Sequence, residues 1–267
     1  MFGVVPRQLW ERKNTPDDNN MCTWSMRCLL IQTEDRNILI DTGIGTKQGE
    51  KFRKHFEPHG ENNLHDSLRA AGLFYEDVTD VLLTHLHFDH VGGAIYRDDS
   101  GELVPTFPHA TYWTNEVHWN WALDPNPREA ASFLPENLLP LQHHGVLEFI
   151  DVSEKDVSWM PGIDLRFLYG HTEAMMMPII TVGEKRIIYC ADLLPSSFHI
   201  GLPWVMSYDV RPLHTMSEKE RLLNEALDHG DLLFFEHDPR VNSGILGRNE
   251  KGRISLRREM NLEEFLS

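Results

Sequence analysis

Short apolar runs, each bounded by polar turn residues, recur along most of the chain and predict β-strands. Near the start, residues 23–32 and 37–40 predict two strands of a hairpin around the polar turn 33–36. Further strands are expected at residues 81–83, 147–150, 165–169, 178–182, 186–190 and 232–235, followed by a hairpin over 244–257.

Helical spacing of apolar residues separates these runs and predicts helices at residues 64–71, 116–123 and 136–143. A fourth helix is indicated by Ser217 and Glu220, which together match a capping box. We expect this helix to begin at Ser217 and to end before Gly230. Strands mixed with helices, without a linker or a repeat, predict one α/β domain over residues 1–267, with residues 1–20 as an N-terminal surface arm.

Composition and charge narrow the class of protein. A hydrophobic content of 41% and a charged content of 25% are ordinary for a globular chain. The formal net charge of −16 repels nucleic acid and anionic membranes, so we expect neither as a partner. Three scattered cysteines and the absence of a signal-peptide pattern at the start predict a reducing, cytoplasmic location.

The most informative motif is the run His-Leu-His-Phe-Asp-His at residues 85–90, directly after the apolar strand 81–83. His85 and His87 project to the same side if the strand continues through them. Asp89 and His90 lie where the chain must leave the sheet, so one short loop can direct four ligands to one place. Imidazole and carboxylate groups suit zinc, and also iron or manganese.

Three further candidate ligands stand at the exits of apolar strands, namely His171, Asp192 and His237. Because the same placement occurs at all four strand exits, we expect these residues to share a metal site. For eight other histidines we expect surface or loop positions: His55, His59, His65, His109, His118, His143, His144 and His229.

In order and spacing, these motifs resemble the metallo-β-lactamase superfamily over about residues 23–240. The aromatic-rich stretch after Gly93 and the segment 191–195 resemble the branch that contains N-acyl homoserine lactonases and methyl-parathion hydrolase. This resemblance implies an αβ/βα four-layer sandwich, with two mixed β-sheets flanked by helices and the site along one edge of the sheets.

The resemblance also implies two divalent metal ions, Zn²⁺ in the first place, with Fe or Mn as alternatives. One ion would be bound by His85, His87 and His171. The second would be bound by Asp89, His90 and His237, and Asp192 would bridge the two. Asp41 would orient a ligand from behind.

The implied reaction is hydrolysis. A hydroxide bridging the two metal ions would attack a carbonyl carbon, and Asp89 would help to orient it. For protonation of the leaving group the candidate is His199, with Ser196, Ser197 and His214 as alternatives. Abundant Trp, Phe and Met residues near the loops predict an apolar pocket for a small neutral substrate, a lactone of the N-acyl homoserine lactone kind or a carboxylic ester.

One departure keeps alternatives open. Well-known lactonases carry a tyrosine three residues after the bridging aspartate, and this chain has Pro195 there. The first alternative is an organophosphate phosphotriesterase or phosphodiesterase, followed by an RNA-processing nuclease and a single-iron sulfur oxygenase. A non-catalytic binding module should have lost ligands, and all seven are kept. The Trp-rich region would also suit the interface of a homodimer.

Overall fold

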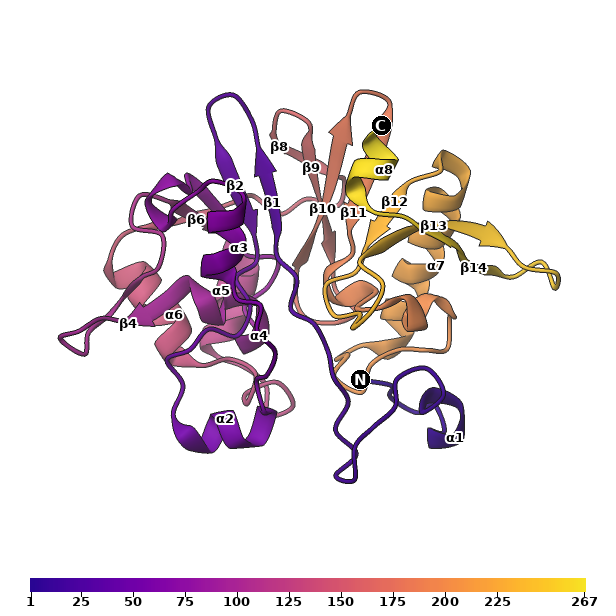
Figure 1. Cartoon of the computed structure of the whole chain (residues 1–267), viewed down its shortest axis with the longest axis horizontal. Helices are drawn as coiled ribbons and strands as arrows, with labels where there is room; N and C mark the ends of the chain where they lie inside the picture. Colours follow the sequence, from indigo (N-terminus) through magenta and orange to yellow (C-terminus); the bar gives the residue numbers. More distant parts are fainter. The chain divides into compact units, whose positions relative to one another are not determined.

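The computed structural model describes the whole chain, Met1–Ser267, which divides into two compact units. Unit 1 comprises Met1–Arg27 and Val152–Ser267, and unit 2 comprises Cys28–Asp151. Each unit contains one mixed β-sheet flanked by helices, which confirms the predicted α/β class (Figure 1). None of the helices combines the length and the apolar character needed to cross a membrane. A single domain over 1–267 stays a prediction.

The five-stranded sheet of unit 2 runs in the order β1-β2-β3-β6-β7. Its strands are β1 (Leu29–Gln32), β2 (Asn37–Ile40), β3 (Asp80–Leu82), β6 (Thr111–Thr114) and β7 (Leu147–Phe149). The predicted hairpin pairs β1 with β2 antiparallel, whereas β2, β3, β6 and β7 run parallel. The carboxyl ends of the parallel strands therefore meet at one edge of the sheet.

Helices and short elements surround this sheet, and the predicted helices at 64–71, 116–123 and 136–143 are all present within one residue of their bounds. The elements are α2 (Glu50–Phe56), α3 (Leu64–Ala70), η1 (Tyr75–Asp77), α4 (Phe88–Val91), η2 (Gly92–Ala94), β4 (Ile95–Arg97), β5 (Leu103–Pro105), α5 (Glu116–Leu123) and α6 (Pro135–His143). One buried apolar cluster joins the strands to α5 and α6 through residues such as Val81, Tyr112, Trp119 and Leu138.

The seven-stranded sheet of unit 1 runs in the order β14-β13-β12-β11-β10-β9-β8. Its strands are β8 (Val157–Met160), β9 (Ile163–Leu168), β10 (Met175–Val182), β11 (Lys185–Tyr189), β12 (Leu232–Phe234), β13 (Ser243–Arg248) and β14 (Ile254–Glu259). Since β10 is antiparallel to both β9 and β11, and β11 is parallel to β12, the strands β9, β11 and β12 end at the same edge.

Helix α7 (Pro212–His229) contacts β13 and β14, and it begins five residues before the predicted start. Pro212 occupies the first turn, where the missing N–H of proline costs nothing. Ser217 therefore lies inside the helix, and the capping-box prediction is wrong. The C-terminal end was predicted correctly, because Gly230 caps the helix with a φ of 73°. The remaining short elements of unit 1 are α1 (Arg7–Trp10), η3 (Ala191–Leu193), η4 (Ser197–Ile200) and α8 (Leu262–Leu266).

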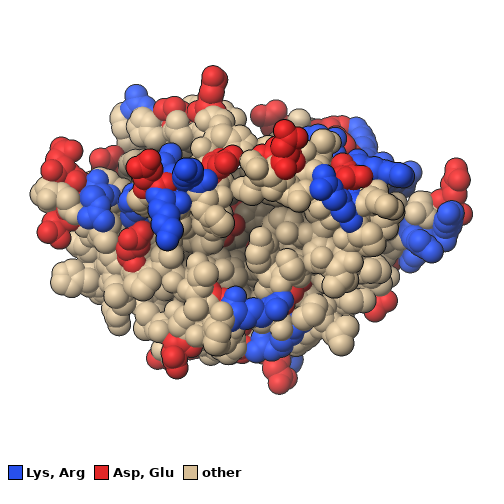
Figure 2. Space-filling view, turned by 90° about the horizontal axis from the view of Figure 1, so that it is seen from below, with Lys and Arg blue, Asp and Glu red and all other residues tan.

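The start of the chain is anchored within unit 1 by an aromatic cluster. Phe2 is only 7% exposed, and its ring lies 5.2 Å from that of Trp10 and 5.9 Å from that of Trp204. On the surface, Lys and Arg lie interspersed with Asp and Glu on the face shown in Figure 2.

Candidate metal centre

In unit 2, the histidine motif follows β3 and continues into α4, as the strand-exit pattern predicts. The ring centroids of His85 and His87 lie 4.6 Å apart, and those of His85 and His90 lie 3.9 Å apart. All three imidazoles are at most 5% exposed. Asp89 stands in the first turn of α4, 4.0 Å from His90 Nε2, and its side chain is 31% exposed. The motif therefore gathers three buried imidazoles and one more accessible carboxylate.

Asp41, at the exit of β2, is fully buried and holds this loop from behind. Its Oδ1 accepts a hydrogen bond from Thr84 N at 2.8 Å, and its Oδ2 accepts one from Thr84 Oγ1 at 2.7 Å. The same Oδ2 lies 3.1 Å from His90 Nδ1. Thr84 Oγ1 in turn lies 3.1 Å from His85 Nδ1. The contact with His90 agrees with the orienting role that the resemblance implies for Asp41.

His118 contributes to the loop in a way that the sequence did not indicate. It was expected on the surface or in a loop, yet it is fully buried in α5. Its Nε2 accepts a hydrogen bond from Leu86 N at 2.9 Å, within the motif itself. The expectation for His118 was therefore wrong, because tertiary packing brings α5 beneath the loop.

In unit 1, the carboxylate of Asp192 lies between two imidazoles. Its Oδ2 is 3.1 Å from His171 Nε2, and its Oδ1 is 3.0 Å from His237 Nε2. The three residues follow β9, β11 and β12, whose ends share one edge of the sheet. Ala191, just before Asp192, has a φ of 43°, a left-handed conformation that costs about 1–2 kcal/mol for a residue with a Cβ.

The second ring nitrogens of these two histidines are also held in place. His171 Nδ1 donates to Asp209 Oδ1 at 2.9 Å, and His237 Nδ1 donates to the carbonyl of Ser25 at 2.7 Å. Asp209 is only 1% exposed, and no sequence motif marked it. Burial lowers the pKa of His171, but the carboxylates of Asp192 and Asp209 outweigh it and raise the pKa to about 10.

The loop before His171 is fixed by Glu218, on the buried side of α7. Its carboxylate accepts hydrogen bonds from the backbone N–H groups of Tyr169 at 2.7 Å and Gly170 at 3.0 Å. A Cβ at Gly170 would lie 2.4 Å from Thr215 N, so only glycine fits at this point. Glu218 was expected in the first turn of the helix that became α7. Its carboxylate instead binds the backbone at the exit of β9.

The five candidate ligand histidines are His85, His87, His90, His171 and His237, and four of them share one arrangement. In each, Nδ1 contacts an oxygen atom: Thr84 Oγ1 for His85, Asp41 for His90, Asp209 for His171 and the Ser25 carbonyl for His237. Such contacts fix the tautomer and the ring orientation, and Nε2 would be the nitrogen that binds a metal ion. The donor set of imidazoles and carboxylates fits divalent zinc, iron or manganese.

His199, the candidate leaving-group acid, lies in η4 and is 1% exposed. Its Nδ1 accepts from Ser196 Oγ at 2.7 Å, and its Nε2 donates to the carbonyl of Met1 at 3.0 Å. Burial lowers the pKa of His199 to about 3, so the ring is neutral near pH 7. It could donate a proton to a substrate only after the contact with Met1 had opened, and its catalytic role stays a prediction.

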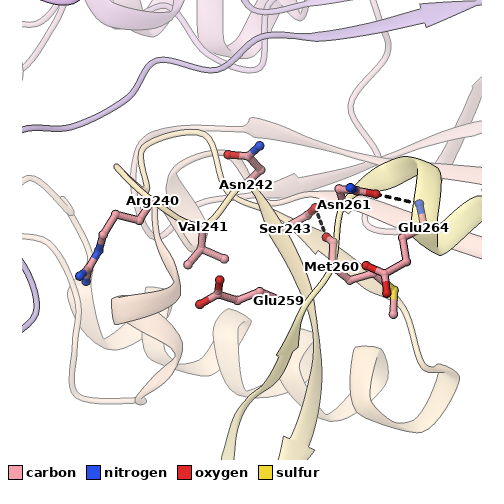
Figure 3. A pocket seen from close by; sticks show the side chains of 8 residues that line it. All are labelled: Arg240, Val241, Asn242, Ser243, Glu259, Met260, Asn261 and Glu264. Carbon is pink, nitrogen blue, oxygen red and sulfur yellow. Dashed lines mark hydrogen bonds between the residues drawn. The ribbon is translucent and has the colours of Figure 1, made fainter.

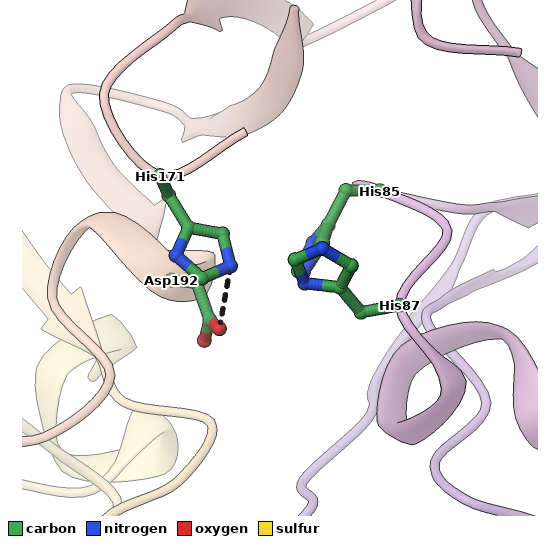
Figure 4. A group of neighbouring side chains, drawn as sticks. All are labelled: His85, His87, His171 and Asp192. Carbon is green, nitrogen blue, oxygen red and sulfur yellow. Dashed lines mark ion pairs between the residues drawn. The ribbon is translucent and has the colours of Figure 1, made fainter. Parts of the chain in front are cut away.

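Figure 4 shows the ion pair between His171 and Asp192, and the neighbouring rings of His85 and His87 on their shared loop. Within each pair, the possible ligand atoms lie within 4.8 Å of each other. A separate cavity of about 260 Å³ lies elsewhere in unit 1 (Figure 3). It is lined by Arg240, Val241, Asn242, Ser243, Glu259, Met260, Asn261 and Glu264, and none of the predicted site residues is among them.

Comparison with known families gives a match over residues 27–237 to the metallo-beta-lactamase superfamily, which covers most of the chain. A curated relative, an N-acyl homoserine lactonase of Bacillus thuringiensis subsp. kurstaki, is 24% identical over 235 residues, covering 82% of each chain. A probable metallo-hydrolase of Mycobacterium tuberculosis is 24% identical and covers 79% of this chain and 74% of its own.

Solved structures show the same fold. A probable metal-dependent hydrolase from Staphylococcus aureus superposes with a TM-score of 0.84 at 27% identity, covering 98% of this chain and 92% of the other. A dizinc quorum-quenching lactonase in complex with its product has a TM-score of 0.70 at 23% identity, covering 90% of this chain and 81% of the other. The predicted metallo-β-lactamase fold is therefore confirmed.

Proposed function

Because the chain belongs to the metallo-beta-lactamase superfamily and is a hydrolase of that superfamily, we propose that it opens an apolar lactone of the N-acyl homoserine lactone kind or cleaves a related carboxylic ester. The observation that carries this proposal is the carboxylate of Asp192, which offers one oxygen to each of two imidazoles. A carboxylate placed this way would offer one oxygen to each of two ions held by those imidazoles. Relatives named as N-acyl homoserine lactonases support the substrate class.

The ligands of the proposed centre are assigned from the ligand pattern of the superfamily. One divalent ion is assigned to His85, His87 and His171, and the other to Asp89, His90 and His237, with Asp192 between them. Zn²⁺ is the proposed ion, since imidazole and carboxylate ligands suit it and a similar fold carries a dizinc site.

Two divalent ions, when bound, supply a water-derived nucleophile near neutral pH and polarise the oxygen under attack. Asp89 is the ligand whose side chain remains most accessible, at 31% exposure. It is therefore placed to accept a hydrogen bond from the attacking group and to hold it in line with the carbonyl carbon. Asp41 and Asp209 hold His90 and His171 in fixed orientations, so the ligands need no rearrangement during the reaction.

The net charge of the chain favours a neutral substrate. The net charge of −16 disfavours approach by a polyanion, which counts against RNA.

Pro195 provides no side-chain hydroxyl for the leaving group, and its carbonyl accepts from His237 N at 2.9 Å. The alkoxide expelled when a lactone ring opens still needs a proton, which would have to come from a group other than residue 195. The three cysteines are free thiols, in agreement with the reducing, cytoplasmic location that we propose.

The test is an assay of purified protein, either loaded with Zn²⁺ or stripped by a chelator, against acyl homoserine lactones of increasing chain length. We expect ring opening by the loaded protein only, and a loss of at least about a hundredfold in Asp89→Ala. Asp124→Ala removes an exposed carboxylate of the same unit and should behave as wild type. Absence of lactone turnover by a protein that holds two ions would refute the lactonase proposal.

An aryl phosphotriester and a phosphodiester in the same assay address the alternative reaction. Turnover of these esters without lactone opening would assign the site to phosphorus chemistry. Metal analysis distinguishes a lactonase or a phosphoesterase from a single-iron enzyme, because the proposed centre holds about two ions per chain. Size-exclusion chromatography with light scattering tests the proposed homodimer.

A further inference from the structure

Glu129 is a buried carboxylate beside the histidine motif, and neither the sequence motifs nor the superfamily pattern assigns it a role. It lies in the segment between α5 and α6 and is only 3% exposed. Its Oε1 is 3.4 Å from His87 Nε2. All of these residues belong to unit 2.

The other oxygen of Glu129 is held by two donors. Trp121 Nε1 donates to Oε2 at 2.8 Å, and Asn126 Nδ2 donates to the same atom at 2.6 Å. These bonds fix the plane of the carboxylate, so that Oε1 faces the imidazole of His87. A carboxylate in a buried position costs several kcal/mol unless charged or strongly polarised donors surround it.

The segment around Glu129 also contacts the backbone of the motif. The carbonyl of Ser132 accepts from Phe88 N at 2.9 Å, directly after His87. The ring of Phe133 lies 4.9 Å from that of His87. Residues 126–133 therefore contact both the ring of His87 and the backbone of the residue that follows it.

His87 differs from the other four candidate ligand histidines, because a different ring nitrogen faces the supporting oxygen atom. In those four, Nδ1 contacts the supporting oxygen. In His87, it is Nε2 that faces the supporting carboxylate of Glu129. An imidazole that donates its N–H to a carboxylate is a stronger metal ligand through its other nitrogen.

We propose that Glu129 is a positioning residue of the metal centre, which accepts the Nε2 proton of His87 and thereby presents Nδ1 of that ring to the ion. The inference rests on the proposed metal centre and not on the substrate. Trp121 and Asn126 complete the support by keeping the carboxylate in place.

The first test measures zinc affinity by competition with a chromophoric chelator. In Glu129→Gln, the amide keeps an oxygen for Trp121 and Asn126 but turns an N–H group toward His87. We expect affinity for the ion held by His87 to fall by about 10- to 100-fold. Glu116→Gln, which removes an exposed carboxylate at the start of α5, should leave the affinity unchanged.

A second measurement separates positioning from simple structural support. Long-range ¹H–¹⁵N correlation spectra of the zinc-loaded protein report which nitrogen of each histidine carries the proton. We expect His87 to show the Nε2–H form in the wild type and to lose it in Glu129→Gln. Trp121→Phe removes one of the two donors that hold the carboxylate, so we expect a smaller loss of zinc affinity than in Glu129→Gln.

The outcomes are distinct. Wild-type zinc affinity in a folded Glu129→Gln variant, or an Nδ1–H form of His87 in the zinc-loaded wild type, overturns the role of Glu129. Two bound ions without lactone turnover overturn the proposed substrate and leave this inference standing. A wild-type chain without affinity for zinc overturns the metal centre, and the inference with it.

Discussion

Replacing Asp41 by asparagine tests whether this residue behind the histidine motif controls both the stability of the protein and its affinity for zinc. The carboxylate is fully buried and accepts from Thr84 N, Thr84 Oγ1 and His90 Nδ1. An asparagine offers only one acceptor oxygen, so its NH₂ group must face donors. One hydrogen bond to a charged acceptor is lost and one buried donor is left unsatisfied, which together lower the free energy of unfolding by about 2–4 kcal/mol.

The effect on metal binding follows from the tautomer of His90. If the NH₂ group of the new side chain donates to His90 Nδ1, the ring proton moves to Nε2, the nitrogen proposed to bind the ion. We expect zinc affinity to fall by about 10- to 100-fold. Urea unfolding in the presence of a chelator measures the stability of the metal-free protein, and a competition titration measures the affinity.

Asp80→Asn is the matched control. Asp80 is 1% exposed and accepts from Trp113 Nε1 at 2.9 Å and from Arg36 Nη1 at 2.9 Å, at the opposite end of β3 from the motif. This variant should also be less stable, but its zinc affinity should match that of the wild type. If Asp41→Asn lost stability and kept full affinity, the reasoning about His90 would be refuted.

Three further outcomes are expected. Asp209→Asn should weaken zinc binding by about 10- to 100-fold in a chelator competition, because a neutral amide replaces the carboxylate that accepts the Nδ1 proton of His171; unchanged affinity would contradict this. Removal of the ions should lower the melting temperature measured by circular dichroism, since ligands that bind only the folded state add about 4 kcal/mol at a thousand times Kd. Burial raises the pKa of Glu225, but hydrogen bonds from Arg166 and Arg186 outweigh it and lower the pKa to about 2. Because that pKa is depressed in the folded state, the stabilisation is present above the unfolded value of 4.5 and is lost as the pH falls toward 2. In urea unfolding across this range, Glu225→Gln should lose less stability with acid than the wild type does, and equal slopes would contradict the prediction.

The sequence by itself determined the class of fold and the candidate ligands, because both depend on local pattern. Apolar runs between turns predict strands wherever the run is buried, and β3 and β12 are entirely buried as expected. The motif at residues 85–90 places four polar side chains within six residues. His171, Asp192 and His237 each follow a strand. Because parallel strands of one sheet end at the same edge, residues that directly follow such strands lie close together.

Only the tertiary structure decided which groups hold those ligands in place. Asp41 is 49 residues from His90, and Asp209 is 38 residues from His171, and no periodicity connects such pairs. Their contacts arise when separate elements pack and bring a buried carboxylate within reach of an imidazole. The same holds for Glu218, whose carboxylate accepts from the backbone N–H groups of Tyr169 and Gly170 in a distant segment. The local capping signal at Ser217 failed because the helix already begins at Pro212. Local patterns thus predict the ligands themselves, whereas the residues that orient them depend on packing between distant segments.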